Sequence, residues 1–326
     1  MRKLQVLDQS PDTRVRWTIA RGMAMAATLL HLVALWIRPG PALLALWYII
    51  IPVLPATFFV TPALWRGLCP LASLNEWGNR VRPAPEIPPA TLGLLRATGL
   101  VLFLLLVPAR HFLFNEHGRF LALVILAVGG TALFLGVVYP VRSAWCNGLC
   151  PVLPVELLYG QAPLQPTERS RCPTCTVCTP RGCIDLAGEK TILQVVGPGR
   201  RSRAWLATPH GAFFAALPGF IVGYNVVGDG ALASAPAVYG TIFEWSLGSL
   251  ALAGLVVGLF GVPSRRILPL LAALAGVAYY WFAGPAIALH LGLGRLASLM
   301  IQLAGIALVL WWARKQPGLR PQAPSR

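Results

Sequence analysis

The chain has 326 residues, of which 56% are hydrophobic and only 12% are charged. Soluble domains carry about 25% charged residues, so this composition excludes an ordinary soluble enzyme and predicts a polytopic membrane protein. The net charge of +16 does not indicate nucleic-acid binding, because no basic helix is combined with a reading motif. Basic loops that stay on the cytoplasmic side of a membrane explain it better.

A polar N-terminal segment, residues 1–16, precedes eight apolar segments of about twenty residues, each long enough to cross a hydrocarbon core of about 30 Å. Their approximate ranges are 17–36, 42–64, 91–108, 120–139, 205–226, 237–262, 267–290 and 296–312. We therefore expect an all-α integral membrane protein with about eight transmembrane helices. Pro52, Pro55 and Pro218 lie inside two of these segments and predict kinks.

The polar stretches divide this chain into five parts. We expect a cytoplasmic segment (1–16), a four-helix membrane half with a Cys-Pro turn at 66–89 (17–140), a cysteine-rich loop domain (141–204), a second four-helix half (205–313) and a cytoplasmic tail (314–326). The loop at 141–204 is the one segment between spans that is long enough for a small extramembrane domain.

The distribution of lysine and arginine predicts the orientation of these helices. With the N-terminus in the cytoplasm, 23 of the 27 basic residues fall on the cytoplasmic side. The four on the opposite side are Arg38, Arg110, Arg119 and Arg295. Basic residues concentrate in cytoplasmic loops, so we expect both termini, and all seven cysteines, on the cytoplasmic side. Thiols there stay reduced, which favours a metal or redox role over structural disulfides.

Six of the seven cysteines lie between residues 146 and 183. Cys172, Cys175 and Cys178 have C-x2-C-x2-C spacing, and Cys183 follows after four further residues. A tight loop with two-residue spacers wraps one corner of an iron–sulfur cubane, and this spacing is typical of bacterial ferredoxins, where three residues separate the last pair and proline follows. Zinc prefers two separated pairs. The run favours an iron–sulfur cluster, with a zinc knuckle as the alternative.

A second cysteine motif combines Cys146 and Cys150 in the word Cys-x3-Cys-Pro. Its last four residues, Gly-Leu-Cys-Pro, occur once more, and there the cysteine is Cys69. Both copies directly follow an even-numbered apolar segment, so two helix pairs would present equivalent Cys-Pro turns at one membrane face. In an ungapped comparison Trp65 stands where Cys146 stands.

The number of clusters stays open, because two fully cysteine-ligated cubanes need eight thiolates and the chain has seven. A single cluster would use Cys172, Cys175, Cys178 and Cys183. In two-cluster ferredoxins the fourth cysteine of a run ligates the other cluster. Two clusters, narrowly preferred, would therefore pair Cys183 with Cys69, Cys146 and Cys150.

These motifs resemble the membrane-bound polyferredoxin family, which includes NapH-like electron carriers of nitrate reductases, NosR-like regulators and CcoG-like oxidase-assembly proteins. The resemblance covers roughly residues 42–185 and implies [4Fe–4S] clusters, one-electron transfer and a bacterial inner membrane. Cys146 and Cys150 match the Cys-x3-Cys-Pro word, Cys69 matches its second cysteine, and the run from Cys172 to Cys183 matches the ferredoxin motif. The chain departs from the family in having one ferredoxin run, and its last four helices fall outside the resemblance.

The function we expect is electron transfer at the cytoplasmic face, in an electron carrier or oxidoreductase subunit without a convincing acid–base catalyst. Basic residues around the cysteine run would steer a soluble acidic carrier of the ferredoxin or flavodoxin type to it. The other partner would be the quinone pool or a membrane redox complex. Two alternatives stay open: a copper-handling metal reductase of oxidase assembly, and a non-redox docking subunit stabilised by zinc.

Other polar residues in the apolar segments suggest weaker sites. Paired axial histidines could hold haem b, although interfacial polar residues explain the five histidines better; these are His31, His111, His117, His210 and His290. Glu244 is the clearest candidate for a buried acid, either taking a proton at a quinol site or forming a solvated or paired helix end. Interfacial aromatic residues, including Trp47 and Tyr48, fit an aromatic belt.

Overall fold

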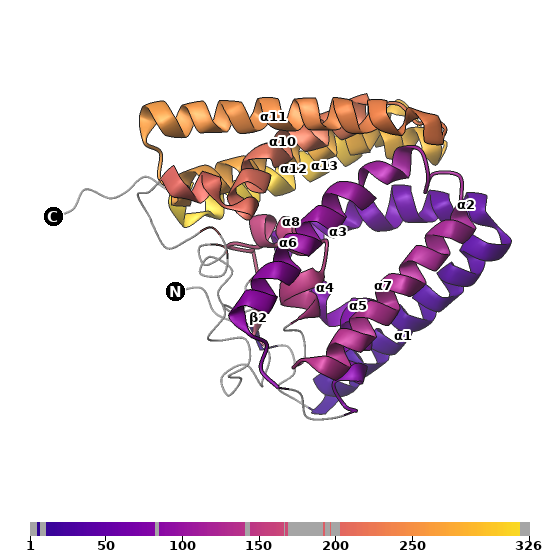
Figure 1. Ribbon diagram of the computed structural model, residues 1–326. Helices are drawn as coiled ribbons and strands as arrows, with labels where there is room; N and C mark the ends of the chain where they lie inside the picture. The colour runs from indigo at the N-terminus through magenta and orange to yellow at the C-terminus, as the bar shows by residue number, and fades with distance from the viewer. Residues whose placement is uncertain are drawn as a thin grey trace.

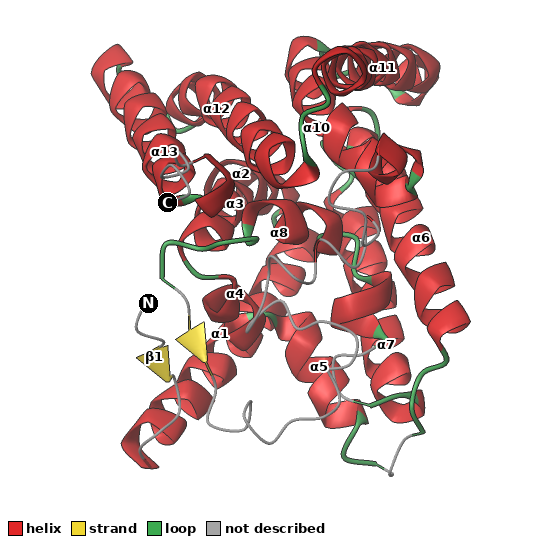
Figure 2. Ribbon diagram, turned by 90° about the vertical axis from the view of Figure 1, so that its left-hand side faces the viewer, coloured by secondary structure: helices red, strands yellow, loops and turns green. Residues whose placement is uncertain are grey.

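The computed structural model describes residues 5–6, 11–81, 85–140, 144–165, 167–168, 192, 196 and 203–319. Two short strands, β1 (Gln5–Val6) and β2 (Thr167–Glu168), pair in parallel. All other regular elements in these ranges are helical, as Figure 2 shows. The expectation of an all-α membrane protein is therefore confirmed for the described residues.

The first half of the chain contains nine helical elements. They are α1 (Pro11–Ile37), α2 (Pro39–Ala45), the π-helical turn η1 (Leu46–Ile50), α3 (Ile51–Val60), α4 (Pro62–Leu68), α5 (Pro70–Gly78), α6 (Pro89–Leu106), the 3-10 turn η2 (Pro108–His111) and α7 (Gly118–Val138).

The second half begins with a π-helical turn and ends with four long helices. The elements are η3 (Trp145–Leu149), α8 (Leu153–Tyr159), η6 (Arg203–Ala207), α10 (Pro209–Val226), η7 (Leu232–Ser234), α11 (Ala235–Phe260), α12 (Ser264–His290), α13 (Arg295–Lys315) and η8 (Pro317–Leu319). Helices α10 to α13 form the orange and yellow layer of Figure 1, and α3 and α8 lie between this layer and α1, α5 and α7.

Seven helical segments of the described chain are long and apolar enough to cross a membrane. They are Val15–Ile37, Pro39–Val60, Pro89–His111, Gly118–Val138, Leu232–Phe260, Ser264–His290 and Arg295–Lys315. Each corresponds to one of the predicted spans. The remaining predicted span, at about 205–226, forms α10, a helix of 18 residues in which His210, Tyr224 and Asn225 lower the mean hydropathy.

The second span is broken where its sequence contains proline. Pro52 and Pro55 lie in α3, which follows the π-helical turn η1. Thr61 then adopts an extended conformation (φ −162°, ψ 96°), and Pro62 begins α4. Proline suits the first turn of a helix because its missing N–H would have no partner there. The kink predicted for this span is therefore a full break, whereas α10 continues through Pro218.

Hydrogen bonds between distant segments show which helix ends meet. Near the C-terminal ends of α6, α10 and α12, Arg110 bonds Tyr224, and Tyr48 of η1 bonds His290. At the opposite end of α6, Arg96 bonds Asn147 of η3. We call the first region the arginine end and the second, which contains Cys69, Cys146 and Cys150, the cysteine end.

The larger hydrophobic core joins the two halves of the chain. Phe59 of α3 stacks on Tyr159 of α8, with ring centroids 4.4 Å apart, and meets Trp312 of α13 edge-on at 5.0 Å. All three side chains are fully buried. Aromatic pairs of this geometry add about 0.5–1.5 kcal/mol to the effect of burial alone, so these contacts fix α13 against the first half beside the cysteine end.

Candidate functional site

The two Cys-Pro turns have the same backbone conformation. Cys69 has φ −56° and ψ 122°, and Cys150 has φ −57° and ψ 118°. Each cysteine ends a helical segment, α4 or η3, and each is followed by a proline. An extended residue before proline is favoured because the proline ring disfavours helical backbone at that position. The structural equivalence predicted from the repeated word is confirmed.

The two turns differ in length, and this corrects the ungapped alignment. The amide of Cys69 donates to the carbonyl of Trp65 at 2.7 Å, four residues back. The amide of Cys150 donates to the carbonyl of Trp145 at 2.9 Å, five residues back. Trp65 therefore corresponds to Trp145 and not to Cys146. Since a π-helical turn holds one more residue than an α-helical turn, Cys146 is the additional residue of the second copy.

The three described cysteines belong to one buried hydrophobic cluster. Cys69 and Cys146 are each 7% exposed, and Cys150 packs against the same cluster without being fully buried. Burial, together with the charge of Cys146, raises the pKa of Cys69 to about 12. Burial followed by the charges of Cys146 and Cys69 also raises the pKa of Cys150. These are protonated thiols unless a bound cation deprotonates them.

A buried ion pair connects the two turns. Arg66 Nε donates to Glu156 Oε1 at 2.7 Å, and both side chains are 4% exposed. Arg66 also donates to the side-chain oxygen of Asn147 at 3.2 Å. Arg66 and Asn147 stand at the same place in the two copies, directly before Gly-Leu-Cys-Pro. The equivalent residues of the repeat therefore bond to each other and hold the Cys-Pro turns side by side.

Helix α6 supports the π-helical turn η3 from the other side. Arg96 Nε donates to the backbone carbonyl of Asn147 at 2.9 Å. A Cβ atom at Gly99 would lie 2.8 Å from the carbonyl oxygen of Leu149, so glycine permits a contact between the two backbones that no other residue allows. The turn that carries Cys146 is thus positioned by two arginines and one close helix contact.

The donor chemistry of the cysteine end fits iron–sulfur ligation, because thiolates hold these clusters. However, within the described ranges no three His, Cys, Asp or Glu side chains converge closely enough to hold a metal ion. Cys172, Cys175, Cys178 and Cys183 lie outside the described residues. The cysteine end therefore supplies three thiols at two matched turns without forming a closed ligand set from described residues alone.

The structure places the other predicted site residues at separate positions. His111 and His290 lie at the arginine end, each bonded to another side chain. His210 is buried at the start of α10. Glu244 is exposed on the surface of α11, so its prediction as a buried acid was wrong: the helical period turns it away from the neighbouring helices.

Sequence reasoning missed the polar residues that hold the cysteine turns. Arg66 and Arg96 counted only as basic residues of one membrane side, and neither Asn147 nor Glu156 was identified. A signal was present, since Arg66 and Asn147 occupy the same position of the repeated word. The hydrogen-bond partner of each residue, however, depends on how η3 packs against α4 and α6.

Comparisons with known proteins leave the assignment to the residues themselves. No protein-family model, no curated protein and no solved structure matches this chain. The resemblance to membrane-bound polyferredoxins therefore rests on the cysteine motifs and on the geometry of the two Cys-Pro turns.

Proposed function

We propose that this protein is a membrane-bound [4Fe–4S] protein of the polyferredoxin type, which transfers electrons at the cytoplasmic face between a soluble carrier and the quinone pool or a partner membrane complex. The observation that carries the proposal is the equivalence of the two Cys-Pro turns, which brings Cys69, Cys146 and Cys150 into one buried cluster. When bound, the clusters supply one-electron chemistry.

The residues around the thiols suit an anionic cluster. Cys69, Cys146 and Cys150 would ligate iron, and Arg66 and Arg96 hold the turn between Cys146 and Cys150 through Asn147. Positive side chains near a thiolate cluster favour its negative charge. Hydrogen bonds and burial around the ligands tune the reduction potential. The chain's own contribution is thus to bury the thiols, fix the two turns and place arginine beside them.

The charge distribution between the two helix ends supports the proposed orientation. Described basic residues at the cysteine end and the helix ends on its side are Arg21, Arg66, Arg80, Arg96, Arg265, Arg266, Arg314 and Lys315. Those on the opposite side are Arg38, Arg110, Arg119 and Arg295. The positive-inside rule then places the cysteine end in the cytoplasm. Helix α10, about 27 Å long at 1.5 Å per residue, is the eighth span of this arrangement.

The position of Glu244 supports a partner within the membrane. This carboxyl group lies on the exposed surface of α11, between exposed Phe243 and Trp245. Ionisable residues inside membranes are costly and almost always face a bundle interior, a water-filled cavity or a polar partner. A second membrane subunit that covers this face of α11 would provide such a surrounding.

The first experiment measures iron, zinc and acid-labile sulfide in protein purified anaerobically, with EPR spectra of the dithionite-reduced sample. Single alanine variants of Cys69, Cys150 and Cys175 separate the two cluster arrangements. The matched control is Ser73→Ala, because Ser73 is buried beside Cys69 and bonds its carbonyl. We expect iron and sulfide in equal amounts and an iron content unchanged in the control.

The outcomes distinguish the proposals clearly. About eight iron atoms per chain, with a loss of about half in Cys69→Ala, would support two clusters. About four, lost in Cys175→Ala and kept in Cys69→Ala, would support one cluster in the run from Cys172 to Cys183. Zinc without sulfide would reject electron transfer and favour the docking subunit. Copper without sulfide would favour the metal-handling alternative, since thiolates also select Cu(I).

A further inference from the structure

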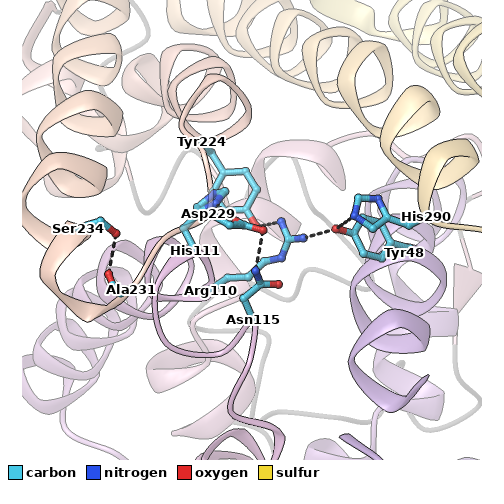
Figure 3. A network of polar contacts seen from close by, with 9 residues as sticks. All are labelled: Tyr48, Arg110, His111, Asn115, Tyr224, Asp229, Ala231, Ser234 and His290. Carbon is cyan, nitrogen blue, oxygen red and sulfur yellow. Dashed lines mark hydrogen bonds and ion pairs between the residues drawn. The ribbon is translucent and has the colours of Figure 1, made fainter. Parts of the chain in front are cut away.

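Arg110 lies at the centre of a polar network at the arginine end, shown in Figure 3. Its guanidinium donates to the hydroxyl of Tyr224 and to the hydroxyl of Tyr48, both at 2.9 Å. It also lies over three aromatic rings, 5.2 Å from the ring centre of Trp47, 5.4 Å from that of Tyr48 and 5.9 Å from that of Tyr224. Such cation–π contacts are worth about 0.5–2 kcal/mol each, so the arginine is held firmly.

Tyr48 passes this network on to α12. The hydroxyl of Tyr48 lies 2.9 Å from His290 Nε2, and His290 Nδ1 lies 2.9 Å from the carbonyl of Ala286. A carbonyl only accepts, so in the neutral ring Nδ1 carries the proton and Nε2 accepts from Tyr48. Tyr48 and Trp47 both belong to the π-helical turn η1, and π-helical turns within α-helices occur frequently at functional sites.

His111 and Asp229 form a second pair beside Arg110. His111 Nδ1 lies 2.6 Å from Asp229 Oδ1, and Asn115 donates to the other carboxylate oxygen at 2.7 Å. His111 is 4% exposed. The carboxylate fixes the proton on Nδ1 of the neutral ring, so the lone pair of Nε2 is available as a hydrogen-bond acceptor.

Three buried polar atoms of this region have no hydrogen-bond partner in the described structure. They are the ring N–H of Trp47, the Nε of Arg110 and the Nε2 of His111. The three residues are neighbours, because Arg110 lies over Trp47 and directly precedes His111. An unsatisfied buried polar atom costs about 1–3 kcal/mol, and native structures explain such atoms by a bound water, ion or ligand. Two donors and one acceptor thus await a group of complementary character.

We infer that the arginine end binds the head group of a membrane quinol. A phenolic hydroxyl accepts hydrogen bonds through its oxygen and donates one, which matches the donors of Trp47 and Arg110 and the acceptor of His111. The rings of Trp47, Tyr48 and Tyr224 provide flat apolar surface for the quinol ring. The ligand arrives from the bilayer, since Trp47 and Arg110 lie within candidate membrane spans. This inference rests on the proposed function only in naming the quinone pool.

Water offers the same hydroxyl chemistry from another source. A buried water fills a polar site with two to four partners, and it would satisfy these three atoms without any ligand. The two sources differ in one measurable property, because a water site does not compete for or respond to a quinol. Helix α6 separates this end from Cys146 by most of its length, so quinol binding here needs no contact with the cysteine end.

The test measures binding of two short-tailed quinols, decylubiquinol and a naphthoquinol of equal tail length, to the full chain in nanodiscs under anaerobic conditions. Titration calorimetry of wild type is compared with Trp47→Phe, His111→Asn and His111→Gln. Asn keeps a donor near the position of Nδ1 and loses Nε2, whereas Gln reaches the position of Nε2 and loses the bond to Asp229. Matched controls are Trp36→Phe, whose ring lies 5.9 Å from Arg119, and His117→Asn.

We expect one of the two quinols to bind wild type, with about tenfold weaker binding in Trp47→Phe and His111→Asn, and less than a twofold change in His111→Gln and the controls. Tenfold corresponds to about 1.4 kcal/mol, the size of one hydrogen bond. Equal weakening in both His111 variants would reduce His111 to a structural role, and no binding of either quinol would leave a water site; either result overturns the inference. Iron is measured in the same samples, so iron without quinol binding rejects this site alone, and quinol binding without iron rejects only the cluster.

Discussion

Arg66 at the cysteine end and Arg110 at the arginine end both lie among apolar helices, but their surroundings differ. Arg66 has a carboxylate partner in Glu156, and both side chains are 4% exposed. Arg110 has no carboxylate within salt-bridge distance and instead meets two tyrosine hydroxyls and three rings. Each end also contains a π-helical turn, η3 at one and η1 at the other.

The difference indicates what each end is built to do. The charge of Arg66 is compensated within the chain, so the cysteine turns stay fixed without a ligand. Around Arg110, three buried atoms lack partners, so that end is complete only when something else is bound. A compensated ion pair suits a scaffold, whereas uncompensated donors and acceptors suit a binding site.

The largest expected effect comes from breaking the buried ion pair. Arg66→Met leaves Glu156 charged and buried, and removal of one partner of such a pair costs about 3–5 kcal/mol. Arg21→Met is the matched control, because the Arg21–Glu76 pair has side chains 26% and 29% exposed and partly exposed pairs contribute about 0–1 kcal/mol. Unfolding free energies in detergent provide the measurement. Equal losses in both variants would contradict the view of Arg66 as the scaffold of this end.

Gly99 tests how closely α6 must approach the cysteine turn. Gly99→Ala places a methyl group against the carbonyl of Leu149, and overpacking of this kind costs about 1–3 kcal/mol. Gly93→Ala on the same helix meets no atom within 4 Å, so it is neutral or stabilising by up to about 1 kcal/mol. Opposite signs of the change in thermal unfolding temperature are expected. If both variants behave alike, α6 does not position η3.

Removal of a tyrosine hydroxyl measures the network around Arg110. Tyr48→Phe deletes two hydrogen bonds, one from Arg110 and one to His290, whereas Tyr224→Phe deletes the one from Arg110. At about 0.5–1.5 kcal/mol per bond, Tyr48→Phe is expected to destabilise the protein about twice as much as Tyr224→Phe. Both losses are expected to be smaller than that of Arg66→Met. The reverse order would mean that the arginine end, and not the cysteine end, stabilises the bundle.

The smallest expected effect is the pH dependence of the His111–Asp229 pair. Partial burial raises the pKa of Asp229, but the hydrogen bond from His111 and the charge of Arg110 outweigh it and lower the pKa below the ordinary value. The pair therefore adds stability above that ordinary value, about 3.9, and loses it as the pH falls through the lowered one. Hydrogen exchange of the Gly230 amide, which bonds the His111 carbonyl at 2.9 Å, reports this change. Asp229→Asn is expected to abolish it, and an unchanged profile in that variant would assign the effect to another group.

Several features of the fold could be predicted from the sequence because they depend on local composition. Apolar length located the seven candidate spans, and the repeated Gly-Leu-Cys-Pro word located two turns with matching backbone. The proline pair in the second span predicted its interruption. These are properties of a segment and its immediate neighbours, which periodicity and motif spacing record.

Other features depend on contacts between distant segments and were missed. Trp47 and Tyr48 read as an aromatic belt, yet they contact Arg110 and His290 from two other spans. Glu244 was expected inside the bundle, because its position along the helix is visible in the sequence whereas the direction of its side chain is not. The π-helical register of Cys146 also escaped notice, since a single additional residue leaves no trace in an ungapped comparison.

The register of η3 has a consequence at the level of the gene. Because the two turns have the same backbone at their cysteines and differ by the one residue that η3 accommodates, a single codon separates a turn with one thiol from a turn with two. Insertion of a cysteine codon between Trp65 and Arg66 would give the first turn the length of the second. The chain would then carry eight cysteines, the number that two fully thiolate-ligated cubanes require.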